Sequence, residues 1–499
     1  MATVEIPEPI THTPQDSFRN EPFTDFTQPE NARRMHEALV KVGAELGREY
    51  DIVIGQHLIK TRDKIRSVNP AQFSQVVGIS QESELEHVDQ AVQAAAAAFE
   101  SWKRTTVEER AALLRSIASI LRERKFEFSA WMIYEVGKNW AEADADIAET
   151  IDFAEYYAAS ALNMGKGVST LQLAGERDSY TYIPLGVGAV IAPWNFPCAL
   201  VGGMTMAAIV CGNTVVMKPS QDAPVVAAKL FEVFQQAGVP DGVVNFCPSS
   251  KAAFGSGLVE HPQVRFVAFT GSREVGLEIN QRAAVARPGQ KWIKRAILEM
   301  GGKDAIVVDA DANLDAAVEG VAQSAFGFSG QKCSACSRAI VDEKVYDVFL
   351  ARLKDRVARI QVGSPSENKT MGPVINEKQM KKIANYIEIG KKEGRLLMGG
   401  GSATPEGGYF VEPTVFADVA PSARIAQEEI FGPVLAVIKA RNFDEALQIA
   451  NDTDFGLTGA VYSTSPEKLE RARQEFHVGN LYFNRKSTGA MVGAHPFGG

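Results

Sequence analysis

Two short stretches of this chain contain residue types that can perform covalent catalysis. The first runs from Gly330 to Cys336 (GQKCSAC) and places Cys333 in a glycine-flanked loop after a predicted helix. The second lies upstream, where Glu299 precedes a pair of glycines (LEMGGK). A cysteine nucleophile and a carboxylate base are what formation and hydrolysis of an acyl-enzyme require. We therefore expect Cys333 and Glu299 to meet in an active site.

The segments around these residues alternate between short apolar strands and helices. A first series is predicted to have strands at 187–192, 214–217, 243–246 and 264–269, with helices near 200–210, 223–237 and 251–259. A second has strands at 305–308, 337–341, 434–439, 460–463 and 480–484, with helices at 313–326, 345–360, 443–451 and 466–476. Helical periodicity dominates from 84 to 162.

Continuous apolar strands separated by helices indicate parallel sheets that are covered on both faces. The predicted fold class is therefore α/β with two parallel-sheet domains, the first of dinucleotide-binding type. Glu299 falls at the junction of the two series, so that Glu299 and Cys333 would face each other across an interdomain cleft.

Composition and charge argue against several classes of function. The 499 residues are 45% hydrophobic, and a formal net charge of −9 provides no positive field for nucleic acid or an anionic membrane. The first thirty residues carry six acids, unlike a transit peptide, and no apolar run is long enough to span a bilayer. Five scattered cysteines form no disulfide framework. We expect a cytoplasmic protein with a small-molecule substrate and no nucleic-acid or membrane partner.

Cys333 and Cys336 also have the spacing of a thioredoxin-like redox pair or half a zinc site. No metal site is predicted, because Cys198, Cys211 and Cys247 supply no second pair. The redox motif would open a helix directly after an early strand rather than follow a glycine-rich loop. We therefore interpret Cys336 as a packing residue, and oxidative blockage of Cys333 by Cys336 is a separate hypothesis.

Six stretches taken together resemble the aldehyde dehydrogenase superfamily, in that family's order and over nearly the whole chain. They are 192–197 (APWNFP), 218–220 (KPS), 269–272 (FTGS), 299–303 (EMGGK), 330–333 (GQKC) and 428–433 (EEIFGP). Three others, 20–23 (NEPF), 332–335 (KCSA) and 479–486 (GNLYFNRK), are similar to the branch that oxidises L-glutamate 5-semialdehyde, the open form of 1-pyrroline-5-carboxylate.

The resemblance implies a role for each catalytic residue. Cys333 would attack the aldehyde carbon as a thiolate, with Lys332, a helix terminus or Glu299 helping to activate it. The Asn195 amide and the backbone N–H of Cys333 would bind the oxyanion. Glu299 would then activate water for thioester hydrolysis, and partial burial should raise its pKa toward that of a useful base.

The cofactor implied by the resemblance is NAD, with NADP as a second candidate. No G-x-G-x-x-G fingerprint follows the first strand, and the family's variant stands at 271–276 (GSREVG), where it would open a helix. The cofactor-binding residues implied are Ile191, Ala192, Pro193, Trp194, Lys218, Ser220, Gln221, Thr270, Gly271, Ser272, Gly301, Glu429 and Phe431.

Two positions depart from the family pattern. Residues 248–251 (PSSK) stand where family members often have Pro-Gly-x-Gly, which leaves the course of that loop open. Gln221 stands where many NAD-preferring members have Glu, and a neutral amide would not repel a 2′-phosphate as a carboxylate does. NAD remains the predicted cofactor.

The resemblance also implies a substrate site and an oligomer. Backbone N–H groups of a glycine-containing loop would converge on the substrate carboxylate. The residues implied are Phe196, Lys332, Ser334, Gly489, Ala490 and Phe497. Residues 1–163 and 185–299 would form the dinucleotide-binding domain and 300–484 the catalytic domain, with 164–184 and 485–499 as oligomerisation flap and substrate loop. A homodimer or higher homo-oligomer is expected, and family members usually continue past the equivalent of Gly499 with a tail that supports this loop and subunit pairing.

Simpler interpretations remain for each site. Cys333 could be a buried inert thiol, Asn195 a turn residue and Glu299 a capping acid, while Lys218, Glu429 and the loop at 489–490 could be ordinary surface features. A different acidic semialdehyde, of succinate or aminoadipate type, is the nearest alternative substrate. A catalytically silent binding or structural protein is the alternative from another class.

Overall fold

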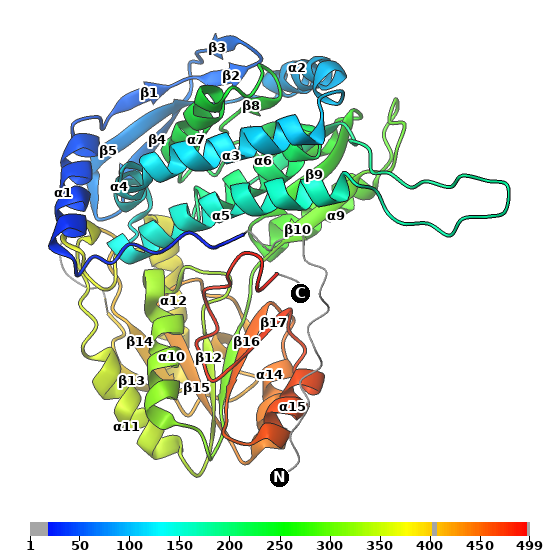
Figure 1. Cartoon of the computed structure of the whole chain (residues 1–499). Helices are drawn as coiled ribbons and strands as arrows, with labels where there is room; N and C mark the ends of the chain where they lie inside the picture. The colour runs from blue at the N-terminus through cyan, green and yellow to red at the C-terminus, as the bar shows by residue number, and fades with distance from the viewer. Residues whose placement is uncertain (1–17, 402–406, 497–499) are drawn as a thin grey trace.

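The computed structural model describes residues 18–401 and 407–496, and it divides into two α/β bodies, each built on a seven-stranded sheet (Figure 1). The first sheet has the order β10-β9-β6-β7-β8-β2-β3. Its strands are β2 (Ile52–Ile54), β3 (His57–Ile59), β6 (Val187–Ile191), β7 (Thr214–Lys218), β8 (Val244–Phe246), β9 (Val264–Thr270) and β10 (Arg295–Glu299). The strands β9, β6, β7 and β8 are parallel, which confirms the four predicted strands; β10 extends the parallel order at one edge, and β2 and β3 add an antiparallel edge at the other.

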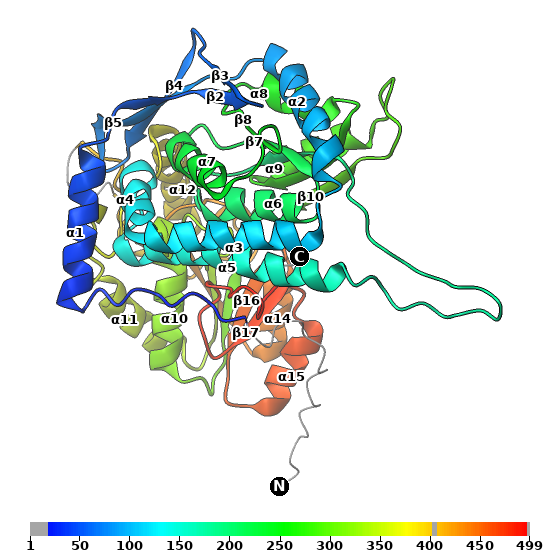
Figure 2. The ribbon, with the colours of Figure 1, turned by 45° about the horizontal axis from the view of Figure 1, so that its top comes forward.

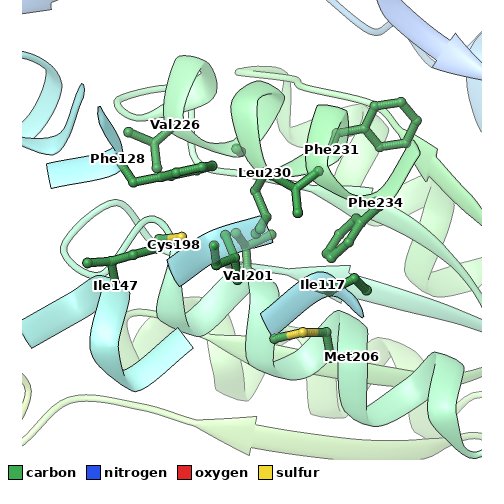
Figure 3. Packing of buried hydrophobic residues seen from close by; sticks show 14 of the residues in the cluster. Ile117, Phe128, Ile147, Cys198, Val201, Met206, Val226, Leu230, Phe231 and Phe234 are labelled. Atoms are coloured by element: carbon green, nitrogen blue, oxygen red, sulfur yellow. The ribbon is translucent and has the colours of Figure 1, made fainter. Parts of the chain in front are cut away.

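Helices cover both faces of the first sheet because alternate residues of each strand point to opposite sides. Ala189 and Ile191 of β6 pack with α2, α8 and α9, whereas Val190 packs with the helices of the other face. These helices are α2 (Glu86–Trp102), α3 (Val107–Glu123), α4 (Lys125–Val136), α5 (Trp140–Met164), α6 (Ala199–Val210), α7 (Pro224–Ala237), α8 (Ala252–Glu260) and α9 (Arg273–Ala284). Figure 3 shows the larger core, in which side chains of α3 to α7 interdigitate.

The N-terminal part of the chain adds a helix and a small sheet that the sequence pattern does not predict. Helix α1 (Pro29–Gly43) packs on α4. A small third sheet has the order β1-β5-β4, formed by β1 (Arg48–Tyr50), β5 (Gln72–Gln81) and β4 (Lys64–Asn69). Its strands are half-exposed and polar, so they lack the continuous apolar runs that marked the parallel strands.

The second sheet has the order β13-β14-β15-β12-β11-β16-β17 and is parallel except at β13. Its strands are β11 (Ala305–Val308), β12 (Arg338–Asp342), β13 (Arg395–Met398), β14 (Thr414–Ala417), β15 (Val434–Ala440), β16 (Thr458–Tyr462) and β17 (Asn480–Phe483). Its helices are α10 (Leu314–Phe326), α11 (Tyr346–Val357), α12 (Glu377–Glu393), α13 (Arg424–Gln427), α14 (Phe443–Asn451) and α15 (Pro466–Glu475). Each predicted strand and helix of this series is confirmed to within a few residues.

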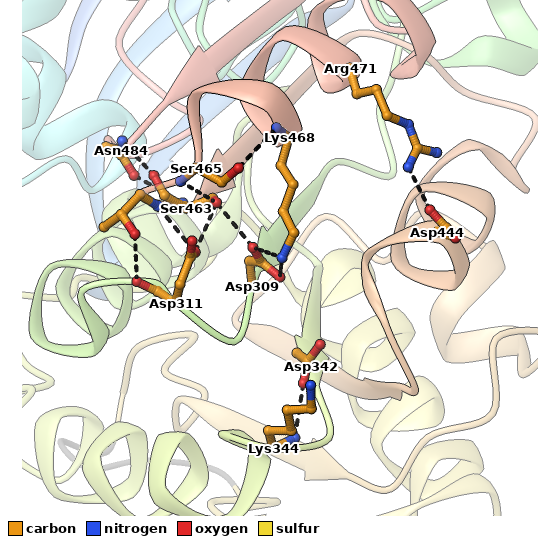
Figure 4. A network of polar contacts seen from close by, with 11 residues as sticks. Asp309, Asp311, Asp342, Lys344, Asp444, Ser463, Ser465, Lys468, Arg471 and Asn484 are labelled. Atoms are coloured by element: carbon orange, nitrogen blue, oxygen red, sulfur yellow. Dashed lines mark hydrogen bonds and ion pairs between the residues drawn. The ribbon is translucent and has the colours of Figure 1, made fainter. Parts of the chain in front are cut away.

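The carboxyl edge of the second sheet is closed by a polar network (Figure 4). Asp309, directly after β11, accepts hydrogen bonds from Lys468 of α15 at 2.6 Å and from Ser463, directly after β16, at 3.0 Å. Ser463 also donates to Asp311 at 2.8 Å, and Asn484 after β17 donates to the Ser463 carbonyl at 3.1 Å. These hydrogen bonds connect the segments that follow β11, β16 and β17 at the carboxyl edge. Cys333 lies before β12, at the opposite edge of the same sheet.

Residues 165–186 form an arm that leaves the end of α5 and projects away from the body (Figures 1 and 2). One antiparallel bridge joins Val168 and Tyr180, with the Val168 N–H donating to the Tyr180 carbonyl at 3.0 Å. Leu171 is 83% exposed and Ile183 79% exposed. The arm spans the residues expected to form a flap at 164–184, and it presents apolar side chains that none of the described residues covers.

Candidate active site

The site lies where the carboxyl edge of the first sheet meets the amino edge of the second. Glu299 is the last residue of β10, and Thr270 pairs with it as the last residue of β9. The short segment 300–304 then leads directly into β11 of the second sheet. On the other side, Cys333 lies in the loop between α10 and β12. Ligands of open α/β sheets usually bind at such carboxyl edges.

An unusual turn presents the nucleophile. Phe328, Ser329 and Gly330 have φ values of 50°, 56° and 66°, so three successive residues adopt left-handed backbone conformations. A side chain at position 330 would collide with the Gly432 carbonyl, which explains the glycine. Ser329 donates to the Gly372 carbonyl at 2.7 Å. Strained backbone of this kind persists only where the surroundings fix it, and it is typical of functional sites.

Gln331 holds the turn and connects it to Asn195. The Gln331 side chain is fully buried, and its Oε1 accepts the Ile375 N–H at 2.9 Å. The Asn195 Nδ2 donates to the Gln331 carbonyl at 3.1 Å, and Asn195 is only 4% exposed. One of the two amide hydrogens of Asn195 is thereby used to orient the group, and the second is free to face a bound oxyanion beside Cys333.

Glu299 is brought to the same place through the two glycines that follow it. A side chain at Gly302 would strike the Cys333 carbonyl, so these backbones are in direct contact. The Glu299 carbonyl accepts the Gly271 N–H at 3.0 Å, which fixes the end of β10. Burial raises the pKa of the Glu299 carboxyl. The structure therefore brings together Cys333, Asn195 and Glu299, and gives Glu299 the shift that a general base needs.

The charges around the thiol come mainly from carboxylates. Burial raises the pKa of Cys333, and the negative charges of Asp304, Glu299 and Glu429 act in the same direction. Lys332 does not oppose them, because its ammonium pairs with Glu142 of α5 at 2.6 Å. The Lys332 ammonium was expected to stabilise the Cys333 thiolate, but it pairs with the Glu142 carboxylate instead. Among the residues expected to activate Cys333, Glu299 is the one that could accept the thiol proton, directly or through water.

The aromatic residues predicted beside the cofactor form one cluster. Ile191 and Ala192 are buried at the end of β6, where the Ala192 N–H donates to the Lys218 carbonyl at 3.1 Å. Pro193 and Trp194 follow, and the Trp194 ring meets Phe431 edge-on at 5.7 Å. Phe431 has a φ of 60° and its carbonyl accepts Gln379 Nε2 at 2.8 Å. Phe431 is therefore held rigidly against Trp194.

Lys218, Ser220 and Gln221 follow β7, as predicted. Burial lowers the pKa of Lys218 to about 8, although the negative charge of Glu82 acts to raise it. Within the described residues, the Lys218 ammonium makes no hydrogen bond or ion pair. Gln221 is exposed, and Ser220 caps the next turn by accepting the Asp222 N–H at 3.2 Å. An unpaired, half-buried lysine suits a hydroxyl-bearing ligand such as a ribose.

The remaining cofactor residues line a glycine-rich surface. Ser272 caps α9 by accepting the Val275 N–H, so the helix N-terminus begins directly after Thr270 and Gly271. Gly301 lies against the Glu429 carboxylate, which accepts the Gly302 N–H at 3.1 Å. Burial raises the pKa of Glu429. Bare backbone beside a helix N-terminus fits a pyrophosphate, and this arrangement fits a dinucleotide.

The loop at 248–251, whose course the sequence left open, is held by Glu82. The Glu82 carboxylate accepts the Ser250 N–H at 2.7 Å and the Ser249 hydroxyl at 3.0 Å. Lys251 pairs with Asp63 at 2.9 Å. These bonds replace the glycine-rich turn of the family pattern and place a carboxylate near Lys218.

The predicted substrate loop lies beside the nucleophile. The Ser487 hydroxyl donates to the Ser334 carbonyl at 3.4 Å, and Arg485 donates to the Gly489 carbonyl at 3.0 Å. Gly489 has a φ of 77°. In the described ranges 18–401 and 407–496, the N–H groups of Gly489 and Ala490 donate to no protein acceptor. These N–H groups are therefore available to a ligand, and their role with a carboxylate stays a prediction, while Phe497 lies outside the described residues.

A charged layer beneath the loop was missed in the sequence. Lys138 and Asp146 form a fully buried pair at 2.7 Å, and the Lys138 ammonium lies 3.8 Å from the centre of the Phe196 ring. Asp146 also accepts the Ala199 N–H at 2.7 Å. Asp146 lies one helical turn after Glu142 on α5, which carries several further acids, and acids at this spacing could have indicated a functional face.

The described residues contain neither a metal site nor a membrane-spanning helix. No group of three or more His, Cys, Asp or Glu side chains in the described part of the chain is arranged to hold a metal. None of the helices seen between residues 18 and 496 is long and apolar enough to cross a membrane. Cys336 is 1% exposed and packs in the core of the second sheet.

Comparison with known proteins shows the family to which this chain belongs. A sequence model of the aldehyde dehydrogenase family matches residues 58–499. The 1-pyrroline-5-carboxylate dehydrogenase of Geobacillus thermodenitrificans is 56% identical over 483 residues, covering 97% of this chain and 94% of the relative. The enzyme of that name from Bacillus subtilis is 51% identical over 484 residues, covering the same shares of both chains. A crystal structure of 1-pyrroline-5-carboxylate dehydrogenase from Thermus with bound NAD superposes with a TM-score of 0.95 at 52% identity, covering 97% of this chain and 94% of that one. The chain belongs to the aldehyde dehydrogenase family.

Proposed function

We propose that this protein oxidises L-glutamate 5-semialdehyde, the open form of 1-pyrroline-5-carboxylate, to L-glutamate with NAD, the second step of proline breakdown. The curated relatives at 51–56% identity carry the name of that activity. One observation on the chain itself carries the proposal. The loop with free N–H groups at Gly489 and Ala490 lies beside Ser334, next to the catalytic Cys333. A substrate with a carboxylate at one end and an aldehyde at the other suits a nucleophile that lies beside such a loop.

The first step forms a carbon–sulfur bond. Glu299 takes the thiol proton of Cys333, directly or through water, and the sulfur attacks the aldehyde carbon while the carbonyl oxygen becomes an oxyanion. The free Asn195 N–H and the Cys333 backbone N–H stabilise this oxyanion. Such donors contribute more to the transition state than to the ground state, because the negative charge is not yet developed in the aldehyde.

The second step requires an acceptor for two electrons. Bound NAD supplies that acceptor by taking hydride from the former aldehyde carbon. Glu299 first releases the thiol proton to solvent and so becomes a base again. Water then attacks the thioester left on Cys333, Glu299 accepts a water proton, and it passes this proton to the departing sulfur as the carbon–sulfur bond breaks. The products are the carboxylate and the free thiol.

Substrate choice is tested with a panel of aldehydes. We expect kcat/KM to be highest for L-glutamate 5-semialdehyde with NAD, and lower for succinate semialdehyde, the aminoadipate analogue and all reactions with NADP. A higher value for succinate semialdehyde would overturn the proposed substrate. Cys333→Ala should form no NADH and still bind NAD, whereas Cys211→Ala, which removes an exposed thiol, should keep its activity.

The arm at 165–186 supports a further part of the proposal, a homodimer or higher homo-oligomer. Leu171 and Ile183 are apolar and exposed on a projecting segment, which is the form of a subunit contact. Sedimentation of the intact protein tests the oligomer, and a monomer at micromolar concentration would contradict it.

A cytoplasmic location is also proposed, because all five cysteines are free thiols.

A further inference from the structure

An N-terminal strap, defined here as residues 18–28, crosses the surface of α5 and reaches the C-terminal loop (Figures 1 and 2). Its middle is fixed independently of that loop. The Lys125 ammonium donates to the Pro22 carbonyl at 2.7 Å, and the Thr24 N–H donates to Asp144 at 2.7 Å. Arg122 pairs with Glu21 at 2.8 Å. The strap is therefore a fixed part of the first body.

Asn20 connects the strap to two other elements. Its Nδ2 donates to the Asp152 carboxylate of α5 at 2.7 Å and to the Val492 carbonyl of the C-terminal loop at 3.0 Å. Asp152 is 4% exposed and also accepts the Glu21 N–H at 2.6 Å. Both hydrogens of one amide are thus used, and one side chain joins segments that are far apart in the sequence.

Aromatic packing reinforces the same junction. The Phe18 ring meets Tyr156 of α5 edge-on at 5.4 Å. A side chain at Gly493 would lie 3.1 Å from the Tyr156 ring and 3.3 Å from the Phe18 ring. Gly493 has a φ of 83°. Residues 492 and 493 therefore sit in a groove between the strap and α5.

The C-terminal loop is held at two places, with the proposed substrate donors between them. At one end, the Ser487 N–H donates to Ser324 at 3.1 Å. At the other end lies the junction with Asn20, at Val492. Gly489 and Ala490 fall between these anchors. Because a tethered loop loses less freedom on binding, the anchors set how well the donors are organised for a carboxylate.

We infer that Asn20 is a positioning residue for substrate specificity, which fixes the loop at 487–493 so that Gly489 and Ala490 present their N–H groups to the amino-acid end of the substrate. This inference rests on the proposed function of that loop. Asn20 touches neither the thiol nor the cofactor surface. Its effect should therefore appear only with substrates that carry the carboxylate.

The test compares two aldehydes on the full-length protein. In Asn20→Ala, KM for L-glutamate 5-semialdehyde should rise about threefold to tenfold, the range expected for one lost hydrogen bond. Values of kcat and KM for propanal, which has no carboxylate, should stay within about twofold, because the chemistry at Cys333 does not require the loop. Amide exchange of residues 487–493 should become faster. Asn20→Asp, which places a second carboxylate against Asp152, should act in the same direction.

Asn31→Ala is the matched control, because Asn31 lies just beyond the strap and donates only to the Asp25 carbonyl, away from the loop. An unchanged KM for the semialdehyde in Asn20→Ala, or an equal rise for both aldehydes, would overturn the inference. Gly489→Ala separates it from the proposed function. If Gly489→Ala leaves KM for the semialdehyde unchanged, the loop does not bind the carboxylate and the proposed function fails. If Gly489→Ala raises this KM but Asn20→Ala leaves it unchanged, the inference about Asn20 alone fails.

Discussion

Replacement of Asn195 by alanine tests the oxyanion site most directly. The Asn195 amide gives one hydrogen to the Gln331 carbonyl at 3.1 Å and leaves the other for the substrate oxygen. Removing one such donor typically lowers kcat by about 10²-fold to 10³-fold, or roughly 2.7–4 kcal/mol of transition-state stabilisation. The Gln331 carbonyl also loses its partner, which costs about 1–3 kcal/mol of stability if no water replaces the amide.

These two effects are separated by a matched variant. The Thr458 hydroxyl donates to the Ser334 carbonyl at 3.4 Å and is buried, so it anchors the same loop without facing the oxyanion. Thr458→Val should destabilise the loop comparably and lower kcat by less than about tenfold. The assay is NADH formation in the steady state and in a single turnover, with NAD binding followed by fluorescence.

A kcat for Asn195→Ala within tenfold of the wild-type value, in a protein that still binds NAD, would refute the oxyanion assignment. An equal loss in Thr458→Val would also refute it, because loosening of the loop would then explain the result. A fall in KM together with kcat would point instead to relief of ground-state strain.

Three further variants test the remaining assignments. Glu299→Gln should slow both the NADH-forming step and thioester hydrolysis, because Glu299 is proposed as the base in both, and should remove the rise of kcat with pH that the raised pKa of Glu299 places above the ordinary carboxyl range; a wild-type kcat with an unchanged pH profile would contradict the role of this base. Lys218→Met should raise KM for NAD at pH 7, and in the wild type this KM should increase as the pH passes about 8, where the ammonium loses its proton. The same shift predicts that the contribution of Lys218 to the free energy of unfolding increases from about pH 8 to 10.5, because the unfolded chain binds the extra proton in that window. Gln221→Glu should lower kcat/KM with NADP more than with NAD, and equal losses with both would show that position 221 does not face the 2′-hydroxyl.

The sequence was sufficient to predict the two parallel sheets and most of their bounds. Strands such as β6 and β11 are buried on both faces, so they appear as uninterrupted apolar runs that period-based reasoning detects. Strand β4 alternates between exposed and buried positions, and β5 is exposed in its first half; both carry many polar side chains, so neither shows the apolar run that would predict it. Strand β10 was also missed, because it lies at an edge and its residues are at most half-buried.

Site residues that lie in short sequence motifs could be predicted. Contacts between site residues and partners far away in the sequence could not. Cys333, Glu299 and Asn195 each lie in a recognisable stretch, and the structure brings them together. The partner of Lys332 could not be chosen, because Glu142 lies 190 positions away among several acids of α5. Asn20 and Val492 are 472 positions apart, and only the folded chain reveals that they meet. Long-range polar pairing depends on tertiary geometry, which local periodicity does not contain.

Because the site lies between opposed edges of the two sheets, nucleotide choice and aldehyde choice are assigned to separate parts of the chain. Residues proposed to select the nucleotide follow β7 and β9 of the first sheet, whereas those proposed to select the aldehyde lie before β12 and after β17 of the second. Changes at distant sites that share no partners usually combine additively. A redesign of nucleotide preference at Gln221 should therefore be compatible with a redesign of aldehyde preference at Gly489, each optimised on its own and then merged in one chain.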